Sequence, residues 1–452
     1  MSVRTGILLL SLTFACSHAL KGGNKDAAAD GPESSGGSGG QSDGGVGGSA
    51  PAGGSMAGSG GNAGSGGIPL VGTGGCWWSK SPGAGGMQPG DHDGWPDSPS
   101  RTPGAAAART RVDAWTAMSS TDAPSGPRRD ATAVWTGKEM IVWGGDDSHP
   151  EATGGRYDPV TDSWKAVSTS VAPRARSGHV AVWTGSEMIV WGGYDGSSHL
   201  SSGGRYDPVA DTWTAMSTTA APTSTSSPSA VWTGSEIIVW GGMDAVMSGR
   251  YSPATDTWRP LATAGAPLSQ IGSTAVWTGS EMIVWGGYLA NACDLALGAI
   301  YNPTTDSWRP MTTVGAPHPR TGHAAAWTGT QMIVWGGDNL STNAGSYDPV
   351  RDTWYALSEV DAPSPRSNPL AFFLPDLDAA GAGRMIVWGG GYDYTTVTGG
   401  IYDFVPDRWQ VVAPYPNVDS AALNQSSRTV VWTGSELLVW DAATGVGARY
   451  RP

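Results

Sequence analysis

A block of polar and apolar residues recurs along the C-terminal three quarters of the chain. One copy reads Ala181-Val182-Trp183-Thr184-Gly185-Ser186-Glu187-Met188-Ile189-Val190-Trp191-Gly192-Gly193. The tryptophan before the glycine pair returns every 45 residues (240 to 285) to 53 residues (335 to 388), at Trp143, Trp191, Trp240, Trp285, Trp335, Trp388 and Trp440, the last followed by Asp441-Ala442. Periods near 50 residues are typical of propeller blades and similar repeats, whose units bury their apolar faces only by packing side by side.

The pattern within each unit predicts four short strands. The continuous run Met188-Ile189-Val190-Trp191 indicates a strand buried on both faces. Gly185-Ser186 suits a type II′ hairpin loop before it, and Asp207-Pro208 opens a turn between two further strands. In the second unit we expect strands at 179–183, 187–191, 204–206 and 212–216.

A second aromatic pattern accompanies the first. A tyrosine and a tryptophan with six residues between them follow six of the glycine pairs, as Tyr157/Trp164, Tyr206/Trp213, Tyr251/Trp258, Tyr301/Trp308, Tyr347/Trp354 and Tyr402/Trp409. An apolar strand, a glycine pair and this spacing together resemble the kelch repeat. The resemblance covers about residues 110–452 and implies a β-propeller of four-stranded blades around a central channel.

Two unmatched aromatic residues predict the number of blades. Trp115 lies in a sequence like that around the fourth-strand tryptophans, but no hairpin precedes it. Tyr450 likewise resembles a third-strand tyrosine, but no strand follows it. With these two residues included, the strand-two tryptophan, the strand-three tyrosine and the strand-four tryptophan each occur seven times. We expect residues 110–118 to pair with 446–451 in a composite closing blade, so that the fold is an all-β, seven-bladed kelch-type propeller without an open edge.

The sixth blade departs from the pattern. Its Trp-Thr-Gly element is missing, Phe372-Phe373 stands near that place, and a longer loop at 375–383 replaces the tight hairpin. We expect the two phenylalanines to act as substitute core residues.

Three segments precede the propeller at 106–452. Residues 1–16 combine Arg4, a ten-residue apolar run too short to span a bilayer, and Cys16 after Ala15, which resembles a bacterial lipoprotein signal. Ordinary signal cleavage and the absence of export are the alternatives. Residues 17–75 form a Gly/Ser-rich segment that we expect to be a disordered tether. The chain would then be exported and lipid-anchored at the bacterial cell envelope.

The segment at 76–105 lies outside the repeat. Its Trp77, Trp78 and Trp95 fit either a plug on one propeller face or an exposed binding patch. If Cys16 is lipidated, Cys76 and Cys293 are the remaining cysteines, and they form either a disulfide in an oxidising compartment or two free thiols.

Composition and motifs argue against nucleic-acid binding, metal binding and catalysis. A formal net charge of −13 makes a nucleic-acid partner unfavourable. His179 and His323 start first strands, where repeat-linked capping explains them, and His149 and His199 lie in solvated loops near acidic residues. The His pair and Cys–Tyr arrangement of copper radical oxidases, which resemble this propeller, is not identifiable here. We expect no catalytic residue, no metal and no cofactor.

The loops give the strongest indication of a binding side. Turns between strands one and two are nearly constant, and so are those between strands three and four; we call their side the turn face. The opposite side, the loop face, carries the variable segments between strands two and three and the connections between blades. Variable loops on a rigid scaffold usually carry recognition. The residues that we expect to contact a partner there are Tyr194, Tyr288, Tyr392, Asp146, Asp195, Asp338 and Asp393.

We therefore expect a monomeric, non-enzymatic module that binds a protein or a glycan, attached to the membrane only through a lipid. The alternative is a carbohydrate-active or cell-wall-active enzyme with its site at the mouth of the channel. Acids and histidines converging on that mouth would favour the enzyme, whereas exposed aromatic side chains would favour the binding module.

Overall fold

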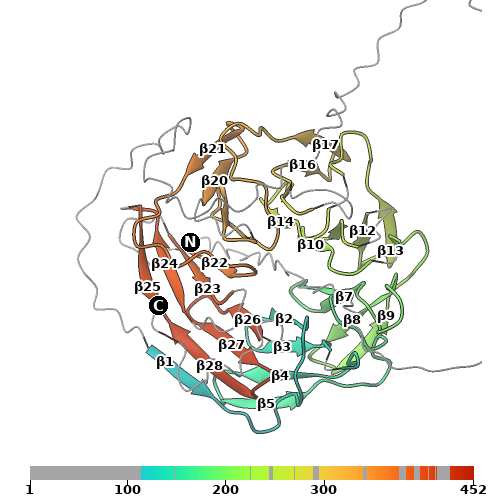
Figure 1. Cartoon of the computed structure of the whole chain (residues 1–452). Helices are drawn as coiled ribbons and strands as arrows, with labels where there is room; N and C mark the ends of the chain where they lie inside the picture. Colours follow the sequence, from blue (N-terminus) through green and yellow to red (C-terminus); the bar gives the residue numbers. More distant parts are fainter. Residues whose placement is uncertain are drawn as a thin grey trace, which may run out of the picture. The chain divides into compact units, whose positions relative to one another are not determined.

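The computed structural model describes residues 114–452 except 147, 224, 244–247, 269, 289–294, 339–343, 376–382, 391–397, 406, 413 and 415–427. These residues form strands and turns, with no helix among them, and so none that is long and apolar enough to cross a membrane. The strands lie in seven antiparallel four-stranded sheets (Figure 1). All-β architecture with seven blades is therefore confirmed.

Blades 1 to 4 each use four consecutive strands. Blade 1 contains β2 (Thr132–Trp135), β3 (Met140–Trp143), β4 (Gly154–Asp158) and β5 (Ser163–Ala166). Blade 2 contains β6 (Val180–Trp183), β7 (Met188–Trp191), β8 (Gly203–Asp207) and β9 (Thr212–Ala215). Blade 3 contains β10 (Ser229–Trp232), β11 (Ile237–Trp240), β12 (Gly249–Ser252) and β13 (Thr257–Pro260). Blade 4 contains β14 (Thr274–Trp277), β15 (Met282–Trp285), β16 (Gly298–Asn302) and β17 (Ser307–Pro310).

Blades 5 and 6 follow the same order, and blade 7 is composite. Blade 5 contains β18 (Ala324–Trp327), β19 (Met332–Trp335), β20 (Gly345–Asp348) and β21 (Thr353–Ala356). Blade 6 contains β22 (Leu370–Leu374), β23 (Arg384–Trp388), β24 (Gly399–Asp403) and β25 (Arg408–Val412). Blade 7 contains β26 (Arg428–Trp432), β27 (Leu437–Asp441), β28 (Val446–Arg451) and, from the other end of the domain, β1 (Ala114–Met118).

The composite blade closes the ring as the aromatic pattern predicts. Strand β1 pairs with β28 so that Trp115 lies opposite Tyr450. Its indole ring also lies 5.7 Å from that of Trp388 in blade 6. The first strand of each blade contacts the first strands of its neighbours at most junctions, including β26 with β2. The first strands are thus innermost, and the fourth strands form the outer rim (Figure 1).

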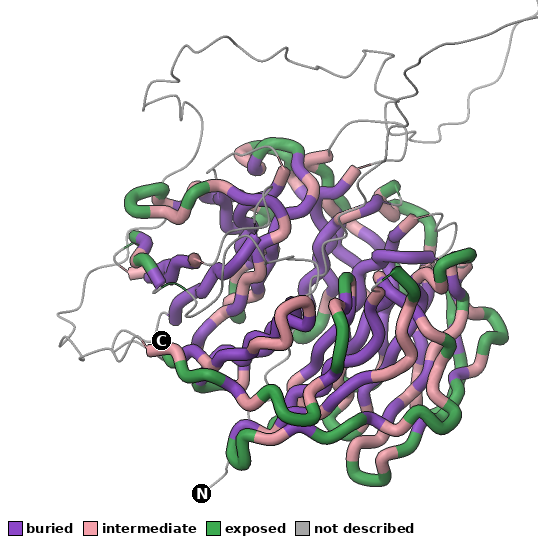
Figure 2. The backbone as a smooth tube through the Cα atoms, turned by 60° about the horizontal axis from the view of Figure 1, so that its bottom comes forward, coloured by how far each residue is buried: buried purple, intermediate pink, exposed green. Residues whose placement is uncertain are grey.

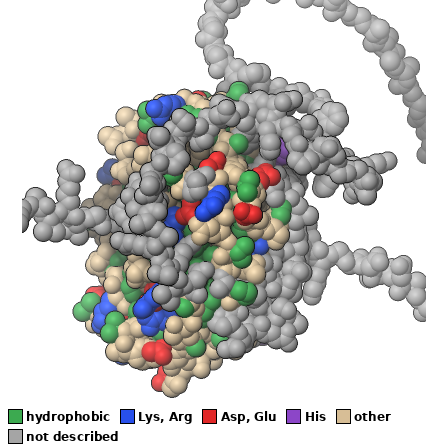
Figure 3. Space-filling view, turned by 90° about the vertical axis from the view of Figure 1, so that its left-hand side faces the viewer, with side chains coloured by type: hydrophobic (Ala, Val, Ile, Leu, Met, Phe, Trp, Pro, Cys, Tyr) green, Lys and Arg blue, Asp and Glu red, His purple; other side chains and the backbone are tan. Residues whose placement is uncertain are grey.

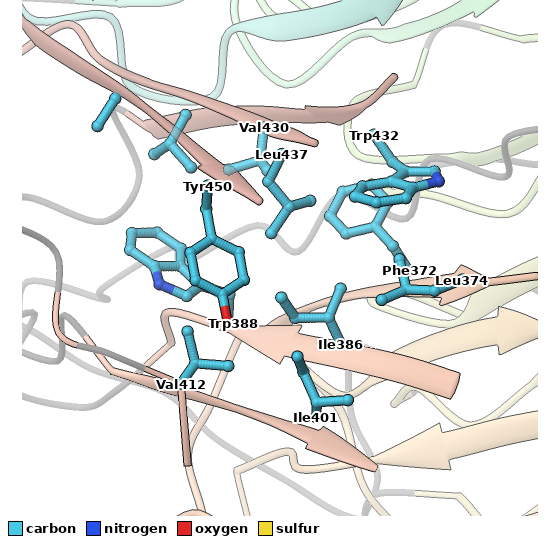
Figure 4. Packing of buried hydrophobic residues seen from close by; sticks show 12 residues of the cluster. Phe372, Leu374, Ile386, Trp388, Ile401, Val412, Val430, Trp432, Leu437 and Tyr450 are labelled. Carbon is cyan, nitrogen blue, oxygen red and sulfur yellow. The ribbon is translucent and has the colours of Figure 1, made fainter. Parts of the chain in front are cut away.

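Each junction between blades has its own apolar core. Buried residues run along the strands, whereas exposed residues gather at the turns (Figure 2). Seven clusters of buried side chains each draw on two neighbouring blades. Between blades 6 and 7, Phe372 lies beside Trp432, and Trp388 beside Tyr450 (Figure 4). Because every strand two is covered on both sides, its apolar run is buried, as Met/Ile-Ile-Val-Trp in blades 1 to 6 and Leu-Leu-Val-Trp in blade 7.

The expected role of the two phenylalanines is confirmed. Phe372 belongs to the core between blades 6 and 7, and Phe373 packs against the core between blades 5 and 6. Adjacent residues on a strand point to opposite faces, so the pair serves both junctions of its blade.

Several sequence predictions lie outside the described residues. These are the signal segment with Cys16, the Gly/Ser-rich segment, the tryptophan-rich segment with Cys76, and also Cys293, Tyr392 and Asp393.

Candidate functional site

The turn face is held by contacts that run from each blade to the next. Arg205 on β8 lies 3.7 Å from Glu187 in the first turn of its own blade, and its Nη1 donates to the carbonyl oxygen of Pro253 in the following blade at 2.5 Å. Corresponding contacts recur at four other junctions, made by Arg156, Arg250 and Arg449 on third strands and by Arg309 on the fourth strand of blade 4. The repeated Glu and Pro of these turns therefore tie blades together.

A second set of contacts joins the third-to-fourth-strand turn to the preceding blade. The Asp162 carboxylate accepts hydrogen bonds from the Ser119 amide at 2.8 Å and the Tyr157 hydroxyl at 2.7 Å. These two donors hold the pKa of Asp162 below its usual value. The Trp164 indole donates to the Ser119 carbonyl at 2.9 Å. Five further blades repeat the arrangement, at Asp211, Asp256, Asp306, Asp352 and Asp407.

On the loop face, a buried arginine braces the corner after strand two. Nη1 of Arg176 donates to the carbonyl oxygens of Gly192 at 2.8 Å and Ser202 at 2.7 Å. Burial lowers the pKa of Arg176 to about 10. Arg128, Arg320 and Arg366 make the corresponding bond to the first glycine of their own blades. The sequence analysis did not predict this brace. The sequence nevertheless contains a signal for it, because blades 1, 2 and 5 carry an arginine fifteen residues before the strand-two tryptophan.

A ring of left-handed residues lies two positions before the first strands, at Asp130, Gly178, Ser227, Gly272, Gly322 and Asn368, all with φ between 53° and 69°. At three junctions the amide of one member donates to the carbonyl of the member before it: Gly178 to Asp130, Ser227 to Gly178 and Asn368 to Gly322. Glycine, asparagine and aspartate adopt this conformation most readily, which accounts for every member except Ser227.

The predicted contact residues that the structure describes lie on this face. Asp146, Tyr194 and Tyr288 directly follow a glycine pair and form antiparallel bridges to Arg129, Ser177 and Ile271. All three are partly exposed. The bridges extend the hairpin of strands one and two beyond the glycines, which fixes the backbone of these residues.

The two other predicted acids are engaged within the protein. The Asp195 carboxylate accepts from the amides of Ser197 at 2.9 Å and Ser198 at 2.7 Å, which hold its pKa below the usual value, and pairs with Arg174 at 2.6 Å. Asp338 accepts a hydrogen bond from the Ser367 hydroxyl, while burial raises its pKa.

The sequence matches the KLHDC2/KLHL20/DRC7 Kelch-repeats domain over residues 105–271 and 229–440, together well over half of the chain. The chain belongs to the kelch-repeat family. No curated protein matches it.

Two buried histidines of this kelch propeller, His179 and His323, join neighbouring blades. Nε2 of His179 lies 2.8 Å from Oγ1 of Thr132 in the preceding blade, and His323 lies equally close to Thr274. Burial lowers the pKa of both imidazoles, that of His323 to about 3. A structural role at the strand start is thus supported. In blade 1 Ala131 occupies the position of His179, because Thr132 and Val180 both lie opposite the strand-two tryptophan of their blades.

The most perturbed acid of the kelch loop face is Asp130. Burial, and then the nearby Asp146, raise its carboxyl pKa to about 7, against a smaller opposing effect of Arg129. The described residues hold no group of three or more His, Cys, Asp or Glu side chains that could bind a metal ion.

Proposed function

We propose that this kelch propeller is a binding module that engages a protein or glycan partner through its loop face. One observation carries the proposal. On the turn face, the recurring Arg, Asp and Trp side chains described above make contacts that join blades, whereas the segments after the glycine pairs differ from blade to blade and leave Asp146, Tyr194 and Tyr288 partly exposed. A rigid scaffold with one uniform and one variable face favours recognition on the variable face.

The chemistry of the exposed residues suits binding. Tyrosine offers a large apolar surface with one polar tip and has few side-chain torsions to immobilise. On the outer side of the blades, by contrast, acidic, basic and single hydrophobic side chains are interspersed (Figure 3). Single exposed hydrophobic residues are normal on protein surfaces and do not mark an interface.

The test is affinity capture with the immobilised full chain as bait. Envelope extracts and purified cell-wall and surface glycans serve as the sources of ligand. We expect a Tyr194→Ala, Tyr288→Ala, Tyr392→Ala variant to lose at least tenfold in affinity for whatever the wild type retains. A matched control replaces three exposed turn-face valines, in Val160→Ala, Val209→Ala, Val350→Ala, and should bind like the wild type. Undiminished binding by a folded tyrosine variant would remove the main support for the loop face.

We further propose that the propeller is held at the cell envelope by a lipid on Cys16. The residues before Cys16 support this, because their apolar run is short and preceded by positive charge. A Cys16→Ser variant should move from the membrane fraction to the soluble fraction. Unchanged fractionation would show that the cysteine is not an anchor.

An enzyme acting on sugars is a second candidate, favoured by Asp130. A carboxylic acid with a pKa near 7 beside another acid is what a general acid for glycoside cleavage needs. Asp130→Asn should then abolish release of reducing ends from a glycan that the wild type cleaves. The absence of such release by the wild type from a broad glycan panel would count against this candidate.

A further inference from the structure

Among blades 1 to 6, where the structure describes this position, the arginine brace of the loop face is interrupted in the two neighbouring blades 3 and 4. Blades 1, 2, 5 and 6 carry Arg128, Arg176, Arg320 and Arg366 at the position before the first strand, whereas blade 3 carries Thr225 and blade 4 carries Gln270. Thr225 replaces the brace with a bond of its own, because its hydroxyl donates to the Met243 carbonyl at 2.9 Å. Blade 4 is therefore the blade in which the replacement of the arginine calls for an explanation.

Blade 4 keeps the carbonyl pair that receives the arginine elsewhere. In blade 2 the Gly192 amide donates to the Ser202 carbonyl at 3.1 Å, and in blade 4 the Gly286 amide donates to the Leu297 carbonyl at 3.0 Å. The Cβ atoms of Gln270 and of the bracing arginine also lie in similar positions relative to the second glycine of their blades. A Cβ on Gly287 would meet that of Gln270 at 3.1 Å, and one on Gly337 would meet that of Arg320 at 3.3 Å.

Gln270 does not take over the arginine's bonds. Its side chain is 1% exposed, yet neither Oε1 nor Nε2 has a hydrogen-bond partner within the described part of the chain. A buried amide without partners costs about 1–3 kcal/mol and needs a physical explanation, for which a bound ligand is one candidate. The glutamine is shorter than arginine, and Leu297 at the other end of the carbonyl pair is 45% exposed.

We propose that blade 4 binds an alkylguanidinium group, supplied by an arginine side chain of a protein partner. The carbonyl oxygens of Gly286 and Leu297 accept its N–H groups as those of Gly192 and Ser202 accept Arg176, and Oε1 of Gln270 accepts another. Guanidinium suits the site better than ammonium, because it is planar, weakly hydrated and already bound in this way in four blades. The identity of the donor as a protein partner rests on the proposed function.

The experiment measures the Tm of the full chain against millimolar ethylguanidinium chloride, with sodium chloride and urea as matched controls. We expect an increase in Tm of about 2 °C when the ion is at about five times its Kd, rising with the logarithm of its concentration above that point. Gln270→Arg should abolish this increase, because the new side chain fills the site. Arg176→Ala, which removes a brace from blade 2, should show an increase larger than the wild type.

A wild type that is not stabilised, or that is stabilised no more than a folded Gln270→Arg variant, overturns the proposal. If Gln270→Arg does not fold, Gln270→Leu takes its place, since it removes the accepting oxygen and should bind the ion at least tenfold more weakly. Because the probe is ethylguanidinium alone, failure here leaves the tyrosine test of the proposed function unaffected.

Discussion

Val171 has a backbone conformation that valine rarely adopts. Its φ is 58°, in the turn before the Ala-Pro pair, where the other turns of this kind carry Asp122, Ala220, Gly265, Gly315 and Asp361. The side chain is 71% exposed and so gains little burial in return. A left-handed residue with a Cβ costs about 1–2 kcal/mol, and a branched Cβ adds crowding.

Val171→Gly should therefore raise the free energy of unfolding by about 0.5–1 kcal/mol, after the entropy cost of glycine is subtracted. Urea denaturation measures the change. The control is Val314→Gly, a valine with 77% exposure that is not left-handed and should gain nothing. Equal gains at the two positions would contradict the strain argument.

Asp130 should make the stability of the propeller decrease as the pH rises. Its folded pKa of about 7 lies above its unfolded value of 3.8, so the folded state binds more protons between these limits. The contribution of Asp130 to stability is then fully present below pH 3.8 and is lost towards pH 7. Because Asp130 is partly exposed, water screens the charge, and we expect a cost of about 1–2 kcal/mol at pH 8.

Asp130→Asn should remove this cost, since Asn368 already occupies the same left-handed position in blade 6. In urea denaturation the variant should exceed the wild type by that amount at pH 8 and match it at pH 4. An equal difference at both pH values would show that ionisation of Asp130 is not the cause.

In the Asp-Pro-x-x-Asp turn of blade 2, the second aspartate accepts a hydrogen bond from the neighbouring blade and, among the described residues, the first does not. Asp211 accepts from the Tyr206 hydroxyl at 2.5 Å and from the Ser168 amide of the preceding blade at 3.0 Å. Asp207 in the same turn accepts only from the nearby amides of Val209 and Ala210. We expect Asp211→Asn to cost about 1–2 kcal/mol in unfolding free energy and Asp207→Asn less than half of that. Equal losses in thermal or urea unfolding would show that the contact between blades adds nothing.

The order of the strands was predictable because each unit carries its own periodicity and turn residues. The contacts between units were not, since their partners lie far apart in the sequence, as Arg156 and Pro208 do. Turn chemistry accounted for Asp162 and Asp211, but only the register of neighbouring blades shows that they also accept from the preceding blade. Likewise, the sequence could place Tyr194 and Tyr288 after a glycine pair without revealing the bridges that fix them.

Across the whole propeller, the recurring Arg, Asp and Trp side chains of the turn face contact neighbouring blades, whereas the segments of the loop face differ in sequence and length from blade to blade. Both the assignment of faces and the proposed guanidinium site assume a closed ring of seven blades. Closure depends on strand β1, which supplies Trp115 and Met118 to the cores on either side of blade 7. The composite blade is thus the central claim.

Two truncations test that claim most directly. Deleting residues 1–100 removes no strand of any blade, whereas deleting residues 1–120 removes β1 and exposes the edge of β28. Losing Trp115 and Met118 from their cores should lower Tm by on the order of 10 °C in the second truncation relative to the first. Equal melting temperatures of the two truncated proteins would contradict closure by β1.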